Sequence, residues 1–292
     1  MLALDAIADL RKWRAQARRP LGLVPTMGAL HAGHGRLIEE ARAQSASMVV
    51  SIFVNPTQFN QREDYAHYPR PLAADLEFCA ARGVDLVFAP AVEEMYPQPQ
   101  VANVEMGRIA DHMEGRFRPG HFRGVATVVL KLFQIVQPDG AWFGEKDAQQ
   151  LVVIRRMVAD LNVPVGIVGV PTVREPDGLA LSSRNRHLSE EERMIAPRLY
   201  QALRAAERAI GEGQSDAEAV KRAAGEVLDA EPRIRIEYLE VADDAEMQPV
   251  PQIAGPVRVA AAVWLGQTRL IDNIHCQPPL NPPISPFNSK CN

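Results

Sequence analysis

The chain has 292 residues, of which 47% are hydrophobic, so it can bury the core of one large or two medium domains. Its net charge of −4 shows no excess of basic residues and argues against a nucleic-acid partner, tRNA included. Three scattered cysteines, and no run approaching about 18 apolar residues, predict a cytoplasmic protein without a disulfide framework or a membrane span. Residues 1–19 place charges between apolar residues at helical spacing, which predicts an N-terminal helix.

Residues 21–44 predict a strand, a turn and a helix. Leu21 to Val24 is a short apolar run that ends at a proline. Leu37, Ile38 and Ala41 recur at the spacing of an amphipathic helix. The turn between them therefore opens a helix N-terminus, where unpaired N–H groups and the helix dipole favour an anion.

Two histidines and two glycines occupy this turn. Gly28 and Gly33 would let phosphate oxygens approach the main chain closely. If the helix begins near Ala32, the rings of His31 and His34 lie on one side and can donate to one phosphate chain. A metal pair and an uninvolved surface turn stay open as alternatives, although no third ligand stands at a familiar spacing.

A continuous apolar run at residues 48–54 predicts a strand that is buried on both faces of a parallel sheet. The sequence NPTQF follows it. Because ligands bind outside the carboxyl ends of such strands, Asn55, Thr57 and Gln58 are placed to read a substrate. The alternative is a proline-stabilised turn whose polar residues face water.

Four more elements and one basic segment follow before the next motif. Residues 63–70 predict a polar and aromatic loop, residues 72–82 a helix, and residues 84–88 a strand. Residues 114–124, EGRFRPGHFRG, contain three arginines and predict either a mobile, anion-attracting flap or an exposed basic loop. Residues 125–136 carry apolar side chains at nearly helical spacing and predict a long helix against the sheet.

The stretch DGAWFGEKDAQQ, residues 139–150, predicts a second strand-to-helix crossing at the same sheet edge as the first. Lys146 is expected to meet phosphate, because it is a point charge on a flexible stem beside an acidic residue that could help to hold magnesium. Asp147 and Gln150 also match a capping box, which would only satisfy N–H groups at the helix end.

A further strand is predicted at residues 165–170, and the sequence LALSSRN follows it. Ser182 and Ser183 can donate to phosphate, and Arg184 offers a planar fork, which together suit a loop that closes on a triphosphate. Taken alone, this stretch would be an ordinary surface loop.

The order of these elements predicts an α/β fold with two domains. We expect a Rossmann-like parallel sheet in residues 1–177 and a smaller α+β domain in residues 178–277. Five prolines and little hydrophobic periodicity in residues 278–292 predict a disordered tail.

The second domain begins with two helix-start signals. Capping boxes at Ser189 with Glu192 and at Ser215 with Glu218 predict two helices, the first running towards Ile210. Alternating apolar residues then predict strands at residues 234–241, 257–265 and 269–271.

The motif HAGH resembles the His-x-Gly-His signature of the nucleotidylyltransferase and class I aminoacyl-tRNA synthetase superfamily. PTMGALHAGH, FVNPTQF, RPGHFRGV, FGEKDAQQ and LALSSRN, in this order, resemble the pantothenate synthetase (pantoate:β-alanine ligase) family over about residues 20–274. The resemblance implies ATP-dependent condensation of (R)-pantoate with β-alanine to pantothenate, through a pantoyl adenylate, with release of AMP and pyrophosphate. It also implies a homodimer, magnesium, and a second domain that acts as a lid.

The resemblance implies roles for particular residues. Catalysis falls on His34, His31 and Lys146. Of the two histidines, His34 is favoured as proton donor and His31 as a positioning donor, since an unperturbed imidazole has a pKa of about 6.5, but the sequence leaves open which ring donates the proton. Pantoate and β-alanine are expected to meet Gln58, Gln150, Asn55 and Tyr68, and Asp75 a magnesium ion held mostly by ATP phosphates. Contacts with ATP are expected from Met27, Gly28, Ala29, Leu30, His31, Ala32, Gly33, His34, Gly144, Glu145, Lys146, Asp147, Val173, Leu181, Ser182, Ser183 and Arg184.

Two other functions are compatible with parts of the pattern. A nucleotidylyltransferase that joins a nucleotide to a small phosphorylated acceptor would share HAGH, but it gives no reason for NPTQF or GEKDAQQ. A nucleotide-sensing module without turnover would retain the fold, but the intact histidines, Lys146 and residues 182–184 argue against such decay.

Overall fold

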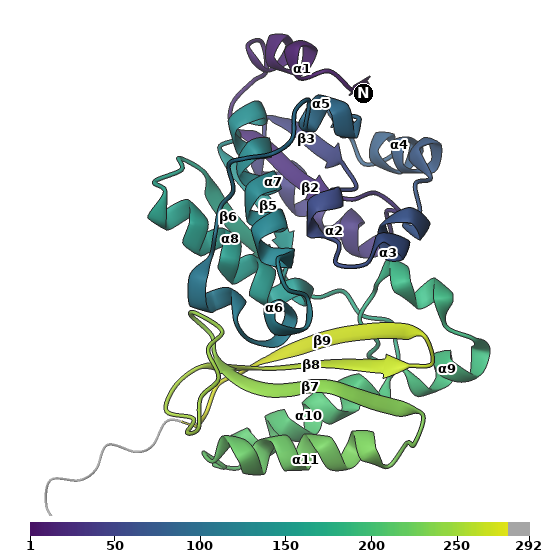
Figure 1. The fold of residues 1–292 in the computed structure, drawn as a ribbon, viewed down its shortest axis with the longest axis vertical. Helices are drawn as coiled ribbons and strands as arrows, with labels where there is room; N and C mark the ends of the chain where they lie inside the picture. The colour runs from purple at the N-terminus through teal and green to yellow at the C-terminus, as the bar shows by residue number, and fades with distance from the viewer. Residues whose placement is uncertain (280–292) are drawn as a thin grey trace, which may run out of the picture.

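The computed structural model describes residues 1–279, and a parallel sheet of six strands organises the first half of the chain (Figure 1). The strand order is β1-β4-β3-β2-β5-β6. The chain thus moves outward from β2 to β4 on one side and to β5 and β6 on the other. Ligands bind outside the carboxyl ends of the strands where the order reverses, here between β2 and β5. The bounds are β1 (Leu2–Leu4), β2 (Leu21–Thr26), β3 (Ser47–Ile52), β4 (Leu86–Phe88), β5 (Gly140–Gly144) and β6 (Gly166–Val170).

Helices cover both faces of this sheet. Alternate side chains of β2 enter different cores: Leu23 packs with α1, α7 and α8, whereas Val24 packs with α2 and α4. The helices are α1 (Ile7–Arg14), α2 (Ala32–Gln44), α3 (Arg62–His67), α4 (Leu72–Ala80), α5 (Val92–Met95), α6 (Met113–Phe117), α7 (His121–Val136) and α8 (Ala148–Asp160), with 3₁₀ turns η1 (Pro56–Gln58), η2 (Gly107–Ala110) and η3 (Glu145–Asp147).

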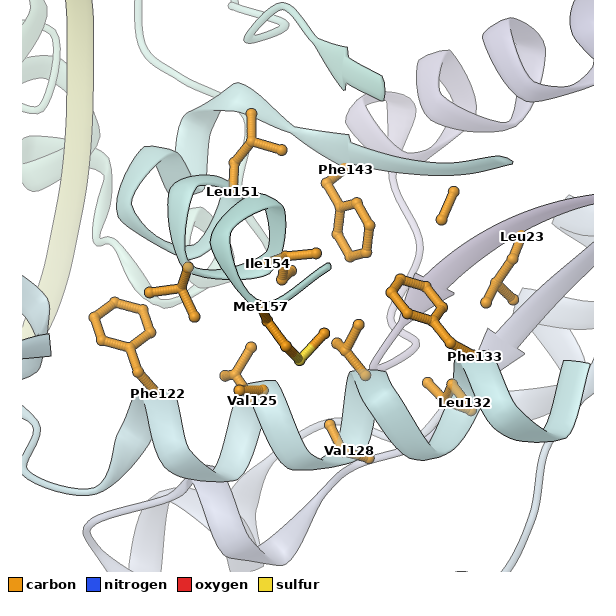
Figure 2. Close-up of a cluster of buried hydrophobic side chains, with 14 of the residues drawn as sticks. Leu23, Phe122, Val125, Val128, Leu132, Phe133, Phe143, Leu151, Ile154 and Met157 are labelled. Atoms are coloured by element: carbon orange, nitrogen blue, oxygen red, sulfur yellow. The ribbon is translucent and has the colours of Figure 1, made fainter. Parts of the chain in front are cut away.

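Figure 2 shows the larger core, in which α7 and α8 pack together beneath β2 and β5. Val125 of α7 and Met157 of α8 point towards one another, and Phe133 of α7 lies between Leu23 of β2 and Phe143 of β5. Each such buried side chain contributes about 1.5–3 kcal/mol relative to exposure. This packing fixes the ends of β2 and β5 against each other, which is what places two loops at one edge.

The second half of the chain forms an antiparallel sheet in the order β7-β8-β9. Its strands alternate: Val259 and Val263 pack on α10 and α11, whereas Ala260 and Tyr238 pack against the core of the first domain. Figure 1 accordingly shows α10 and α11 on the side of this sheet away from the parallel sheet. The elements are η4 (Ser183–His187), α9 (Glu190–Ile195), α10 (Arg198–Gly211), α11 (Ala217–Asp229), β7 (Ile234–Asp243), β8 (Val257–Leu265) and β9 (Thr268–Cys276).

Several elements differ from the sequence predictions. The N-terminal helix is preceded by β1, a three-residue edge strand too short to show a period. Pro25 does not end its strand but lies within β2 opposite Ser51; pairing of β2 with β5 ends at Leu23, so no hydrogen bond is lost on that side. The loop predicted at residues 63–70 is largely α3.

The predicted helix boundaries in the second domain were partly wrong. The capping box of Ser189 with Glu192 is present, but the helix expected to reach Ile210 breaks before Pro197, whose ring cannot continue it. The second helix is capped by Asp216, not by Ser215, because the Asp216 carboxylate accepts the N–H groups of the first turn.

The remaining domain predictions have different outcomes. The domain boundary expected at 177/178 lies in the connection between β6 and η4 and stays a prediction. Most of the predicted tail, residues 280–292, lies outside the described residues. Within residues 1–279, no helix has the length and apolar character needed to cross a membrane.

Candidate active site

A cavity of about 240 Å³ lies at the carboxyl ends of β2, β5 and β6, at the point where the strand order reverses. Its wall contains His34 from the first crossing, Lys146 from the second and Ser183 from the later loop. The expectation that these segments face one space is therefore confirmed. The predicted residues in the wall are Met27, His31, Gly33, His34, Gln58, Tyr68, Gly144, Lys146, Asp147, Gln150, Val173, Leu181, Ser182, Ser183 and Arg184.

The two histidines form a reciprocal cap on α2. The Nδ1 atom of His31 accepts the N–H of Gly33 at 3.1 Å, and the Nδ1 atom of His34 accepts the N–H of His31 at 3.3 Å. The ring centres are 4.2 Å apart. Because each Nδ1 is an acceptor, each neutral ring carries its hydrogen on Nε2. The main chain thus selects the tautomer, and both rings are donors in the cavity wall.

Burial sets the charge of these rings. It lowers the pKa of His34 to about 3, helped by His31 and Lys146, and it lowers the pKa of His31 to about 4, helped by Lys146 and Arg186. Both rings are therefore neutral at neutral pH. The expectation that His34 acts as a proton donor with an ordinary pKa is wrong for this state, because it neglected desolvation.

Asp75 holds the turn that precedes these histidines. Its two carboxylate oxygens accept the N–H groups of Ala29 and Leu30, both at 2.8 Å, and only 3% of the residue is exposed. Gly28 has a φ of +81°, and a Cβ there would stand 2.8 Å from an oxygen of Asp75. The predicted metal role of Asp75 is therefore corrected to a structural one: it fixes the turn from behind.

Some predicted ATP contacts lie outside the cavity wall. Gly28, Ala29 and Leu30 shape the turn, and Leu30 is part of the core beside α2. Ala32 and Glu145 also do not line the cavity; an oxygen of Glu145 lies 3.8 Å from the guanidinium of Arg258. Gly33 does line it, and a Cβ there would meet the His31 ring at 2.8 Å. The motif PTMGALHAGH therefore determines the conformation of the turn as well as the contacts with the ligand.

The second crossing runs from β5 through η3 into α8. Asp147 is the N-cap of α8 but its side chain makes no capping hydrogen bond, so the capping-box alternative with Gln150 is wrong. Asp147 is exposed and lines the cavity together with Gln150. The neighbouring Gln149 is buried instead and donates to the carbonyl oxygens of Ile109 and His112. Adjacent glutamines thus have separate roles, one facing the cavity and one in the core.

Gln58 is held from behind by an amide. The Nδ2 atom of Asn55 donates to Oε1 of Gln58 at 3.0 Å, and its Oδ1 accepts the hydroxyl of Thr57 at 3.0 Å. Asn55 is 1% exposed and does not line the cavity. The predicted substrate contacts of Asn55 and Thr57 are thus corrected, since neither residue lines the cavity and Asn55 orients Gln58. The alternative of a water-facing turn is wrong for the buried Asn55 and Gln58, whereas Thr57 is exposed.

Arg118 and His121 line the cavity, although the sequence predicted only a flap or an exposed loop here. These residues lie in α6, α7 and their junction, and both side chains are mostly buried. Arg118 donates to Nε2 of His121 at 3.2 Å, and Nδ1 of His121 donates to the carbonyl of Gln58 at 2.8 Å. An arginine and a histidine in a Gly-rich segment were the sequence signal for a site here. Their burial in the cavity wall depends on the fold, so the sequence did not show it.

A large part of the remaining wall is apolar and was interpreted from the sequence as core. These residues are Leu37, Phe53, Val125, Val128, Val129, Leu132, Phe143 and Val170. On the opposite, polar part, Ser182 accepts the N–H of Arg184 at 3.3 Å, which leaves its hydroxyl hydrogen free to donate. The cavity therefore combines an apolar end with hydroxyl, imidazole, ammonium and guanidinium donors.

Carboxylates in the cavity are few. Within residues 1–279, Asp147 is the acidic side chain of the wall, and no group of three or more His, Cys, Asp or Glu side chains is arranged to hold a metal. One carboxylate fits Mg²⁺ that is bound chiefly by substrate phosphates, which is the usual way this ion is held.

Comparison with known proteins gives consistent results. The pantothenate synthetase of Chloroflexus aggregans is 54% identical over 275 residues, which cover 94% of this chain and 99% of the relative. The crystal structure of pantothenate synthetase from Thermus thermophilus has a TM-score of 0.89 at 49% identity, covering 94% of this chain and 99% of that one. Pantoate-beta-alanine ligase from Francisella tularensis, solved in complex with beta-gamma ATP and beta-alanine, has a TM-score of 0.79 at 36% identity and covers 94% of this chain and 97% of that one.

The match to a family covers the same stretch. Residues 3–275 match the family described as Pantoate-beta-alanine ligase. This range includes both strand-end crossings and the second sheet except for Cys276, the last residue of β9. The chain therefore belongs to the pantoate-beta-alanine ligase family.

Proposed function

We propose that this chain condenses (R)-pantoate with β-alanine in an ATP-dependent reaction that yields pantothenate, AMP and pyrophosphate. The observation that carries the proposal is one cavity that joins His34 of the first crossing to Lys146 of the second, in a chain of this ligase family. A carboxylate does not react with an amine, because its leaving group would be oxide. ATP is needed to convert it into an acylating agent.

In the first step, a carboxylate oxygen of pantoate forms a bond to the α-phosphorus of ATP. The bond from that phosphorus to the bridging oxygen breaks, and its electron pair leaves with pyrophosphate. Negative charge grows on the phosphoryl oxygens, where the Nε2–H groups of His31 and His34 and the ammonium of Lys146 act as donors. Catalysis in this step consists of placing hydrogen-bond donors and positive charge where negative charge develops, while the imidazoles stay neutral.

In the second step, the amine of β-alanine attacks the carbonyl carbon of pantoyl adenylate. The C–N bond forms, the bond to the AMP oxygen breaks, and the nitrogen loses a proton to solvent. β-Alanine keeps its carboxylate throughout and therefore needs a cation. Arg118 is a mostly buried guanidinium in the wall, beside His121, and we assign it that carboxylate.

Pantoate carries two hydroxyls, a carboxylate and two methyl groups. We assign the polar groups to Gln58 and Gln150, and the methyl groups to the apolar wall near Val129 and Phe143. The amide of Gln58 is pre-oriented by Asn55, so an analogue that lacks the hydroxyl bound by Gln58 would leave a positioned donor unpaired. Residues 181–184 complete the proposed ATP site on the polar side, and Tyr68, which lines the same cavity, keeps its proposed contact with pantoate or β-alanine.

Three further parts of the proposal rest on the chemistry and on family membership. Mg²⁺ would be held by ATP phosphates together with Asp147, and when bound it offsets phosphate charge. We also propose that the enzyme works as a homodimer and in the cytoplasm.

The decisive experiment is pantoate-dependent exchange of labelled pyrophosphate into ATP, followed by β-alanine-dependent formation of AMP. We expect exchange with pantoate and ATP alone, and AMP release only after β-alanine is added. A stable nucleotidyl product without β-alanine turnover would favour a nucleotidylyltransferase instead. ATP binding without exchange or AMP release would favour a nucleotide-sensing module.

A further inference from the structure

We propose that Asn273, in the second sheet, is a positioning residue for Lys146 and so couples the second domain to the chemical step. This inference rests on the proposed role of Lys146 at the phosphates of ATP. Asn273 lies in β9, more than one hundred residues after η3, and does not line the main cavity. Its influence must therefore pass through the residues that it contacts.

The side chain of Asn273 reaches across to the 3₁₀ turn that carries Lys146. Its Nδ2 donates to the carbonyl oxygen of Glu145 at 2.9 Å and to that of Lys146 at 2.8 Å. These are consecutive carbonyls of η3, whose first residues have no side-chain cap. One amide thus fixes the main chain on both sides of the Lys146 peptide group.

The orientation of this amide follows from its neighbours. The Oδ1 atom of Asn273 accepts a hydrogen bond from Nη1 of Arg258 at 2.8 Å. A guanidinium has no acceptor and a carbonyl has no donor, so the oxygen must face Arg258 and the nitrogen must face η3. Asn273 is 5% exposed, so water does not replace these bonds readily.

The backbone of Asn273 is fixed as well. Its N–H donates to Asp272 at 2.8 Å, and its carbonyl accepts Nη2 of Arg174 at 3.2 Å. Arg174 also forms a bidentate pair with the buried Asp272, at 2.5 and 3.0 Å. Because Arg174 lies in the connection that follows β6, the first domain holds Asn273 while Asn273 holds η3.

This arrangement has a consequence for catalysis. Lysine has a long flexible stem, so the position of its ammonium depends on a well-placed main chain. Displacing a catalytic group by about 1 Å can cost about 10²-fold in rate. Loss of the two bonds from Asn273 should therefore lower the rate of adenylation rather than the affinity for pantoate.

The test uses Asn273→Ala and the isosteric Asn273→Asp, which keeps the shape but turns an acceptor towards the two carbonyls. We expect kcat in pantoate-dependent pyrophosphate exchange to fall about 10- to 100-fold in both, with the KM for pantoate unchanged. In a Lys146→Ala background, Asn273→Ala should cause no further loss, because its effect passes through the missing ammonium. Losses that multiply in the double variant would overturn the proposal.

Glu246→Gln is the matched control. It cuts ion pairs from the second domain to Arg108 and Arg156 of the first, at 2.5 and 3.1 Å, without touching η3. This variant should keep the parent kcat, and an equal loss would mean that any domain contact matters, which contradicts a specific role. Folding is checked by thermal melting, and Asn273→Asp serves if Asn273→Ala does not fold.

The failure of the inference and that of the proposed function give different results. A parent chain without any exchange would overturn the function. The affinity for ATP, measured by calorimetric titration, would still test the coupling. Asn273→Ala should weaken ATP binding in the parent chain and leave it unchanged in Lys146→Ala, and equal weakening in both would contradict the coupling.

Discussion

The first crossing, from β2 into α2, and the second, from β5 into α8, occupy equivalent places at the sheet edge but are supported differently. The first is held mostly by its own residues, since His31 and His34 cap each other and Asp75 binds the turn from a neighbouring helix. The second has no side-chain cap of its own, and its carbonyls are bound by Asn273 from the other domain.

This difference shows why two motifs of similar length are not equally informative. The support of the first crossing lies largely inside the motif that carries the chemistry, so its geometry is encoded locally. The support of the second arrives from β9, and nothing within GEKDAQQ indicates it. The first loop is therefore sensitive to changes in its own sequence, and the second to changes in a distant strand.

The largest expected effect lies in the first crossing. His34→Ala should keep the fold and lower kcat about 10²–10³-fold, because it removes a donor aimed at growing phosphate charge. Pyrophosphate exchange measures this. The exposed His67→Ala is the control and should retain the parent rate. Full activity of His34→Ala would remove the ring from the mechanism.

The next effect separates a turn-holding role from a metal role for Asp75. Asp75→Asn should lower the free energy of unfolding by about 1.5–3 kcal/mol, because two charge-assisted hydrogen bonds to Ala29 and Leu30 are weakened. Urea denaturation measures the loss, and Glu77→Gln, on the exposed side of the same helix, should cause none. Recovery of activity with added Mg²⁺ would instead revive the metal assignment.

Within the second crossing, adjacent glutamines should separate substrate binding from folding. Gln150→Ala should raise the KM for pantoate about tenfold, and more than the KM for ATP, because it loses one hydrogen bond to a charged substrate. Gln149→Ala should instead lower Tm, since it removes the side-chain partner of the Ile109 carbonyl and of the Glu114 N–H. Equal changes in both KM values for Gln150→Ala would contradict its assignment to pantoate.

The last expected effect concerns pH. Burial holds the pKa of His34 at about 3 and that of His121 at about 4, below the unfolded value of about 6.5. Below pH 6.5 the unfolded chain thus binds more protons than the folded chain. The contribution of these histidines to the free energy of unfolding is therefore complete above pH 6.5 and decreases as the pH falls towards 4. The expected slope is about 1.4 kcal/mol per pH unit for each histidine.

Urea denaturation between pH 7 and pH 5 measures this slope. His34→Ala should have a flatter dependence than the parent by the share of one histidine, since it removes one depressed group. The same slope in both chains would mean that His34 titrates normally in the folded state, which would restore it as a proton donor near neutral pH.

The sequence predicted much of the fold because apolar periodicity is a local property. Runs such as residues 48–54 and 125–136 are buried in the structure as a strand and a helix, and the α/β class followed from their order. Helix boundaries were less predictable where a single residue determines the helix end. Pro197 ends one helix, and Asp216 caps another in place of Ser215.

The site likewise has features that could be predicted along the chain and features that depend on contacts between distant segments. Strand periodicity and the order of connections, both readable along the chain, were enough to bring His34 and Lys146 to one edge of a parallel sheet. The folded arrangement was needed to establish that the imidazoles are neutral, that Asp75 holds a turn, that Arg118 faces the cavity, and that Asn273 fixes the lysine turn. Desolvation and long-range hydrogen bonds depend on which distant segments meet, and no single motif contains that information.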